Sequence, residues 1–142
     1  MDNKLKLIYC IFTVIISLLS FTISADERPL GVHQQIISVS TLENIPGHNL
    51  TSVIVELNPG VIVPTHTHSG FVYVYVLEGT VRSQLDQGKT VEFSVGQSWT
   101  EPPGMIHSIT QNPSTTDKVK FLAVLVTKDG AELTHFEQTK GK

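Results

Sequence analysis

The sequence predicts an all-β domain of the barrel or sandwich type. After Arg28 the apolar residues cluster in short segments rich in β-branched residues, and no long window shows helical three-four spacing. Residues that favour turns, namely Gly, Pro, Asn and Asp, separate these segments. Many short strands at such spacing are typical of β-sandwiches and barrels.

In chain order, the pattern predicts strands at residues 34–40, 49–57, 61–66, 71–78, 80–86, 90–94, 98–101, 107–111 and 118–127. The breaks between them carry turn chemistry, for example Asn58-Pro59-Gly60 and Pro102-Pro103-Gly104. Residues 134–142 resemble a polar, frayed end of the chain. We therefore expect one folded domain over residues 26–137 and a short tail over 138–142.

The segment Phe71 to Leu77 (FVYVYVL) is apolar on both alternating faces. A strand with one face in water should alternate between apolar and polar residues. One face can point into the barrel, and the other needs a second sheet, the N-terminal segment or a partner subunit. A homodimer is a reasonable expectation, because two-fold dimers are the commonest oligomers.

Residues 1–25 have the layout of a secretory signal peptide. A stretch of 17 residues without a charge, Leu7 to Ile23, follows Lys4 and Lys6 and precedes Ser24-Ala25. Cleavage after Ala25 would release a periplasmic or secreted domain. An uncleaved N-terminal membrane anchor is the alternative, since the stretch is only slightly shorter than a membrane span.

Charge and cysteine content exclude several classes of function. Removing residues 1–25 takes away two of the 10 basic and one of the 13 acidic residues, which leaves 8 − 12 = −4. This charge argues against binding to nucleic acid, and the absence of basic clusters argues against stable contact with an anionic membrane. The single cysteine, Cys10, lies in the predicted signal, so the mature domain would have no disulfide and no Cys nucleophile.

Three histidines form a candidate metal site. His66 and His68 are two residues apart at a predicted strand end, so their imidazoles project to the same face. His107 follows a rigid turn, Pro102-Pro103-Gly104, which could return it to the same end of the barrel. Three imidazoles can hold a first-row divalent metal ion and leave positions open for water or substrate.

The spacing around these histidines resembles the two motifs of the cupin superfamily. The first reads Gly60-x5-His66-x-His68 with Gly79 eleven residues on, and the second reads Gly96-x5-Pro102-x-Gly104-x2-His107. The resemblance implies a small cupin β-barrel, a double-stranded β-helix of the jelly-roll type. It leaves the function open, because cupins include dioxygenases, isomerases, decarboxylases, sugar binders, storage proteins and sensors.

One departure from the cupin pattern concerns the fourth ligand. Cupins normally add a glutamate at a position that falls here on Val72 or Tyr73. Without a carboxylate, an ion keeps its full charge of +2 against three neutral imidazoles, which favours an anionic, chelating substrate. Two residues are candidates for a ligand or catalytic role in its place: Tyr73, and Glu101 beside Pro102.

The other aromatic and histidine residues have simpler interpretations. Trp99 and Tyr75 are expected to pack in the core or to form an aromatic pocket wall. His33, His48 and His135 lie in turn or tail contexts and are expected to be solvated.

Three functions fit this sequence. The first is a metal-dependent enzyme of the dioxygenase type, with Fe(II) favoured and Mn, Ni, Zn or Cu as alternatives, acting on a small anionic or chelating substrate. The second is a periplasmic module that binds or senses a metal or small molecule without turning it over, because no secure general base can be named. The third is a dimerising scaffold with an inactive site.

Overall fold

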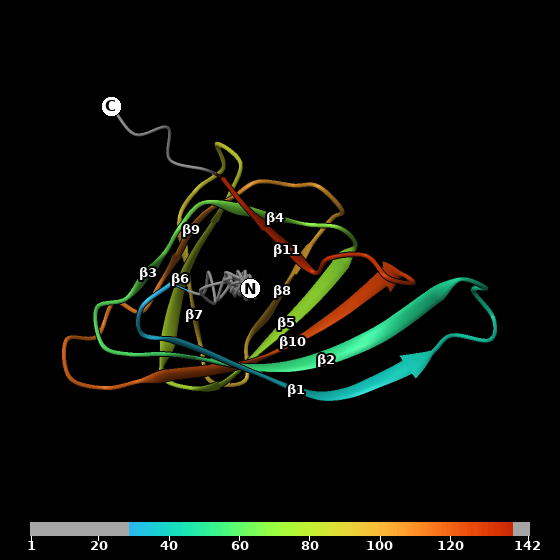
Figure 1. Ribbon diagram of the computed structural model, residues 1–142. Helices are drawn as coiled ribbons and strands as arrows, with labels where there is room; N and C mark the ends of the chain where they lie inside the picture. Colours follow the sequence, from blue (N-terminus) through green and yellow to red (C-terminus); the bar gives the residue numbers. More distant parts are fainter. Residues whose placement is uncertain (1–28, 138–142) are drawn as a thin grey trace, which may run out of the picture.

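Two antiparallel sheets face each other and form the barrel (Figure 1). A computed structural model describes residues 29–137, and it contains no helix in that range. The first sheet has the order β1-β2-β10-β5-β8, with bounds Val32–Thr41, His48–Leu57, Val119–Lys128, Phe71–Glu78 and Ser98–Glu101. The second has the order β11-β4-β9-β6-β7, with bounds Thr134–Phe136, His66–His68, His107–Gln111, Thr80–Leu85 and Val91–Ser94, and β3 (Ile62–Val63) also pairs with β9.

The all-β prediction is confirmed, and the predicted strands lie close to the observed ones. Of the predicted strands, only the one at residues 61–66 is not a single strand, because the structure divides it into β3 and β4. Pro64 lies between the two pieces, and proline has no N–H with which to continue the hydrogen-bond ladder. The division places His66 at the first residue of β4.

The expectation that the chain is a frayed tail from Thr134 onward is wrong. Residues 134–136 form β11, which pairs antiparallel with β4 in the register Thr134↔His68 and Phe136↔His66. This segment is too short and too polar to show a strand pattern in the sequence, and it is ordered by its pairing partner. The predicted signal at residues 1–25 and the tail at 138–142 lie outside the described residues.

The core lies between the inner faces of the two sheets. Val72, Val74 and Val76 of β5 are buried there, together with Leu57, Val81 and Val119. The alternate residues of β5 point outward: Phe71, Tyr73, Tyr75 and Leu77 are 37% to 41% exposed. No described residue buries this outer face, and the homodimer that the sequence predicts stays a prediction.

Gly70 closes the short connection between β4 and β5. A Cβ atom at this position would lie 1.9 Å from the carbonyl oxygen of Val126 and 2.8 Å from the Thr127 side chain. No residue with a Cβ atom fits so close to Val126 and Thr127, so glycine is required between β4 and β5.

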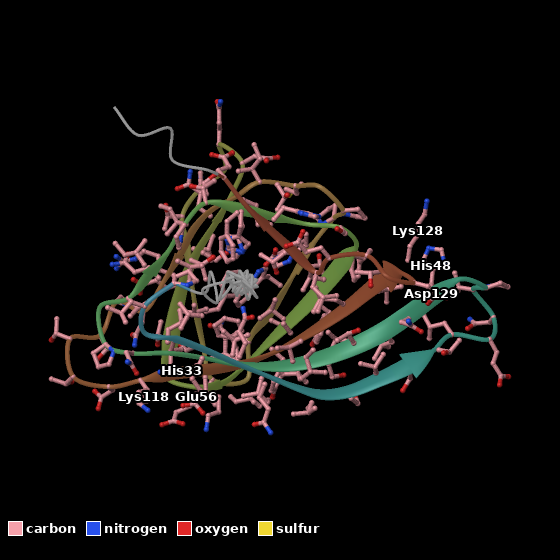
Figure 2. All side chains as sticks on the ribbon, viewed as in Figure 1. His33, His48, Glu56, Lys118, Lys128 and Asp129 are labelled. Atoms are coloured by element: carbon pink, nitrogen blue, oxygen red, sulfur yellow. The ribbon has the colours of Figure 1, made fainter. Side chains whose placement is uncertain are left out.

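Charged and polar side chains gather at the two ends of the first sheet (Figure 2). His33 is the register partner of Glu56, whose carboxylate also lies 3.9 Å from Lys118, and all three are on the outer surface. His48 lies at the other end of the sheet, beside Lys128. Within residues 29–137 no helix is long and apolar enough to span a membrane.

Candidate metal centre

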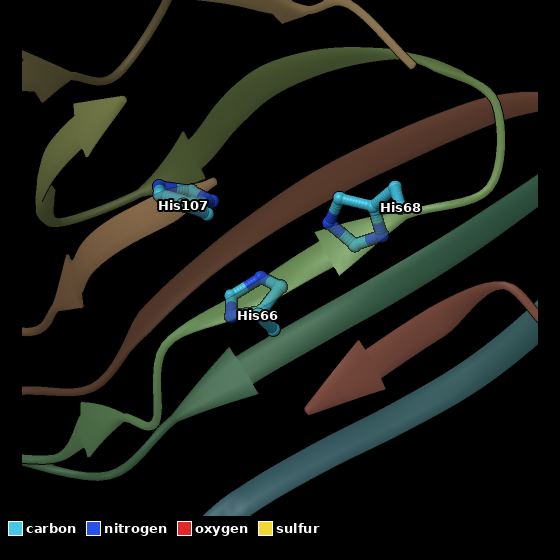
Figure 3. A group of neighbouring side chains, drawn as sticks. All are labelled: His66, His68 and His107. Carbon is cyan, nitrogen blue, oxygen red and sulfur yellow. The ribbon is translucent and has the colours of Figure 1, made fainter. Parts of the chain in front are cut away.

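His66, His68 and His107 converge inside the barrel, as the sequence predicts (Figure 3). One nitrogen of each ring lies within 4.8 Å of one nitrogen of each of the others. His66 and His68 come from β4, and His107 of β9 is the register partner of His66. Strand alternation and cross-strand pairing together bring the three rings to one place.

Backbone carbonyls fix the orientation of the first two rings. The Nδ1 atom of His66 donates a hydrogen bond to the carbonyl oxygen of Pro64 at 2.8 Å, and Nδ1 of His68 donates to that of Leu133 at 3.0 Å. Because a carbonyl only accepts, Nδ1 carries the proton in both neutral rings and Nε2 presents a lone pair. Metal-binding histidines have this arrangement, in which the second nitrogen is held by a neighbouring acceptor.

His107 is placed by the turn before it and by a buried serine. The N–H of Gly104 donates to the carbonyl oxygen of His68 at 2.9 Å, which ties the predicted Pro102-Pro103-Gly104 turn to the histidine strand. The ring's Nε2 lies 2.8 Å from the hydroxyl oxygen of Ser83 on β6. Its Nδ1 is buried without a hydrogen bond partner, so this nitrogen is available as a ligand.

The protein environment favours neutral imidazoles at β4. Burial, together with the neighbouring His107 and His68 rings, lowers the pKa of His66 to about 4, against the opposing effects of the Pro64 hydrogen bond and of Glu101. Burial also lowers the pKa of His68, although Glu101 and the Leu133 carbonyl oppose this shift. At neutral pH both rings therefore keep the free lone pair that a metal ion needs.

The carboxylate of Glu101 lies against two of these histidines. Its Oε1 is 3.2 Å from Nδ1 of His107, and its Oε2 is 3.4 Å from Nε2 of His68. Burial raises the pKa of this carboxyl, but the His107 and His68 rings and the Trp99 N–H outweigh that effect and bring the pKa below its ordinary value. An ionised carboxylate therefore lies beside the histidines, supplied by one of the two residues that the sequence offers in place of the usual glutamate.

The structure also shows where the other residues singled out in the sequence lie. Tyr73 points outward and is 40% exposed, so it lies away from the histidines and is not a candidate ligand. Tyr75 also points outward, which corrects its assignment as a core or pocket residue. Trp99 lines the cavity as expected, stacked on Phe93 with ring centroids 4.6 Å apart. His135 is exposed, near Ser69 and Glu132.

The histidines open onto a small apolar cavity between the sheets. Its volume is about 80 Å³, well below the roughly 300–1,000 Å³ of pockets for drug-sized ligands. The apolar walls come mainly from the first sheet and include Val53, Val55, Val74, Phe121 and Leu125. The lining residues of the described chain include no Lys and no Arg, and their only ionisable groups are Glu101 and the three histidines.

Two parts of the site carry no signal that identifies them in the sequence. Ser83, which holds His107, is an unremarkable residue of a β-strand, and only its pairing with β9 brings it to the ring. Thr134 and Phe136 line the cavity because β11 pairs with β4. The apolar residues two positions before and after it, Val81 and Leu85, indicate from the sequence that Ser83 points inward, but not what it meets.

Solved structures with the same fold include cupins from several bacteria. A cupin superfamily protein from Desulfitobacterium hafniense has a TM-score of 0.57 and 14% identity, with 71% of this chain and 82% of that one covered. The DMSP lyase of Ruegeria pomeroyi has a TM-score of 0.56 and 17% identity, with 66% and 45% covered. An oxalate decarboxylase variant from B. subtilis has a TM-score of 0.57 and 26% identity, with 75% of this chain but 28% of the decarboxylase covered.

The comparison with curated proteins finds no match. The family model described as the cupin domain matches residues 53–125, a range that includes both histidine motifs. This match covers half of the chain, and the sheet topology and solved structures agree with it. The protein therefore belongs to the cupin family.

Proposed function

We propose that this protein is an exported metal-dependent enzyme of the dioxygenase type that acts on a small chelating molecule. The observation that carries the proposal is the convergence of three histidine nitrogens within 4.8 Å of one another beside a small apolar cavity. Fe(II) is the favoured ion, with Mn, Ni, Zn or Cu as alternatives, because imidazole ligands suit all of these metals.

The donor set fits such an ion. His66 and His68 offer Nε2 lone pairs, and His107 offers a buried Nδ1 that lacks a hydrogen bond partner. A bound Fe(II) would supply the reactivity toward dioxygen that the protein side chains lack. The rigid strands hold the rings in place, and the apolar walls exclude water from the reacting molecule.

The cavity supports a chelating substrate more than a strongly anionic one. Its lining residues include no Lys or Arg that could pair with a substrate charge, and Glu101 adds a negative charge. An apolar body of a few atoms could pack against Val74 and Phe121 while a pair of oxygen or sulfur atoms reached the ion. Neutral or singly charged diketones, catechols and thiols have this chemistry.

A second candidate is a binding or sensing module that uses the same pocket without turnover. One observation favours it: apart from the histidines, Glu101 is the single ionisable group among the described lining residues, and it lies against two of them. An enzyme that needs an independent general acid or base would find none here.

Metal analysis followed by an oxygen-uptake screen separates these functions. The purified protein, loaded anaerobically with Fe(II), is expected to hold one ion per chain and to consume oxygen with one member of a panel of thiols, diketones and catechols. His66→Ala, His68→Ala and His107→Ala should each lose most of the metal while remaining folded, because the core strands do not depend on the ion. Stoichiometric iron without oxygen uptake would favour the binding module, and full metal occupancy in His107→Ala would overturn the site.

A further inference from the structure

Glu101 enters the site from a strand next to β5. β8 pairs with β5 in the register Val72↔Glu101, and both side chains point inward, with exposed fractions of 1% and 2%. The carboxylate therefore projects into the barrel from the cross-strand neighbour of Val72. A buried carboxylate in such a position is costly unless it is paired.

The pairing of this carboxylate is incomplete. Oε1 accepts a hydrogen bond from Nε1 of Trp99 at 2.9 Å. Oε2 is buried and has no hydrogen bond partner. The nearest donor candidate, Nε2 of His68, is 3.4 Å away, but the proton of that neutral ring is on Nδ1, where it meets the Leu133 carbonyl. Two lone pairs thus face each other across the gap, an arrangement that a cation between them would stabilise.

The distances also match the spacing of atoms around one metal ion. Bonds of about 2.0–2.2 Å at angles between octahedral and tetrahedral place two ligand atoms about 2.8–3.6 Å apart. Nε2 of His68 lies 3.4 Å from Oε2 of Glu101, and Nδ1 of His107 lies 3.2 Å from Oε1. The distance between Nε2 of His68 and Oε2 of Glu101 therefore fits two ligands of one ion, and Oε1 lies beside Nδ1 of His107.

We propose that Glu101 is the fourth protein ligand of the metal, that Oε2 is its binding atom, and that Trp99 is a positioning residue that holds the carboxylate by Oε1. This inference rests on the proposed three-histidine metal site. Its consequence is a divalent centre whose charge is reduced from +2 to +1 before any substrate enters. Such a centre suits a substrate that is neutral or carries one negative charge.

The first test is Glu101→Gln. The amide keeps the size of the side chain and can still accept from Trp99, but its other end can now donate to Nε2 of His68. We expect the affinity for Co(II), measured by competition with a chelator, to fall at least tenfold and the visible spectrum of the Co(II) protein to change. We also expect the metal-free variant to melt at the same or a higher temperature, because the unpartnered carboxylate oxygen has been replaced by a donor.

The melting temperature of the metal-free protein separates a ligand from a structural ion pair. If Glu101 only stabilises the fold by pairing with charged histidines, Glu101→Gln should lower the melting temperature without metal and leave Co(II) affinity unchanged. That result would overturn the inference. Glu92→Gln is the matched control, since Glu92 is a half-exposed carboxylate that pairs with Arg82 away from the histidines, and it should change neither the spectrum nor the affinity.

Two further variants test the geometry. Glu101→Gln combined with Val72→Glu moves the carboxylate to the adjacent strand on the same inner face, and should regain most of the lost Co(II) affinity. Trp99→Phe removes the hydrogen bond to Oε1 and should reduce the affinity for Co(II) by less than Glu101→Gln does.

If Glu101→Gln does not fold, Glu101→Asp, whose side chain is one methylene shorter, should fold and show the weaker Co(II) binding and altered spectrum. Failure of the natural protein to bind Co(II) would contradict the metal site itself, whereas unaltered binding in the Glu101 variants would contradict only the ligand assignment.

Discussion

The Nε2 atom of His107 lies 2.8 Å from the hydroxyl oxygen of Ser83, and both side chains are buried. Ser83 is on β6, which pairs with β9, so the contact joins two neighbouring strands of the second sheet. The hydroxyl sets which face of the His107 ring meets the cavity, and Nδ1 is then directed toward Glu101. Ser83 is therefore a positioning residue for the metal centre.

Ser83→Ala should weaken metal binding by roughly tenfold, the lower end of the effect seen when a group that orients a metal-binding histidine is lost. The fold should be retained, because the change removes one oxygen atom and keeps the Cβ atom. Ser108→Ala is the control, since Ser108 bonds to the Asp86 carbonyl away from the site. Metal titration of both variants checks this prediction, and equal affinities would show that Ser83 does not orient the ring.

The metal-free protein should lose stability as the pH falls from about 6.5 toward 4. Burial holds the pKa of His66 near 4, while in the unfolded chain this ring takes up a proton near its ordinary value of 6.5. Over this range the unfolded state binds more protons than the folded state, so the free energy of unfolding decreases as the pH falls. The lowered pKa of His68 acts in the same direction.

For His66 alone the full effect is about 3 kcal/mol. Urea unfolding of the metal-free protein at a series of pH values between 7 and 4 measures it. His66→Asn should flatten this dependence, whereas His33→Asn, at an exposed position outside the barrel, should not. A pH profile that is equally steep in His66→Asn and in the natural protein would contradict the prediction.

A second copy of the chain is expected to cover the outward face of β5. Phe71, Tyr73, Tyr75 and Leu77 form an apolar row on this face, and each is more than a third exposed. A two-fold axis through such a row would bury it against its own copy. Light scattering after size exclusion should therefore give twice the mass of one chain.

Tyr73→Glu should convert this dimer to monomers, because it places a carboxylate in the middle of the row and two like charges near the axis. Val91→Glu introduces the same charge at an exposed apolar position of β7 on the other sheet, and should leave the dimer intact. A natural protein that is monomeric at high micromolar concentration would refute the dimer.

The mature protein is expected to begin at Asp26. The uncharged stretch at residues 7–23 and the small residues Ser24-Ala25 have the layout of a cleaved export signal. Mass spectrometry of the protein from the extracytoplasmic fraction should find this N-terminus. Recovery of the full-length chain in the membrane fraction would instead indicate an uncleaved anchor.

The sequence by itself determines the class of the fold and the three histidines. Turn residues divide the chain into short strands, and this division depends only on local backbone preferences. The spacing of His66 and His68 places both on one face of a strand whatever that strand packs against. The turn at Pro102-Pro103-Gly104 is also local chemistry, and it indicates that His107 could return to the same end of the barrel as the pair.

The tertiary structure alone decides the rest of the site. The segment FVYVYVL is apolar on both faces, so alternation cannot tell whether Val72 or Tyr73 points inward, and only the closed barrel places Val72 inside. Glu101 meets the histidines because β8 pairs with β5, a contact between residues 29 positions apart at Val72↔Glu101. β11 exists because it pairs with β4. Each of these features depends on which strands become neighbours, and the free energy that selects those neighbours comes from burial of the whole core rather than from any local segment.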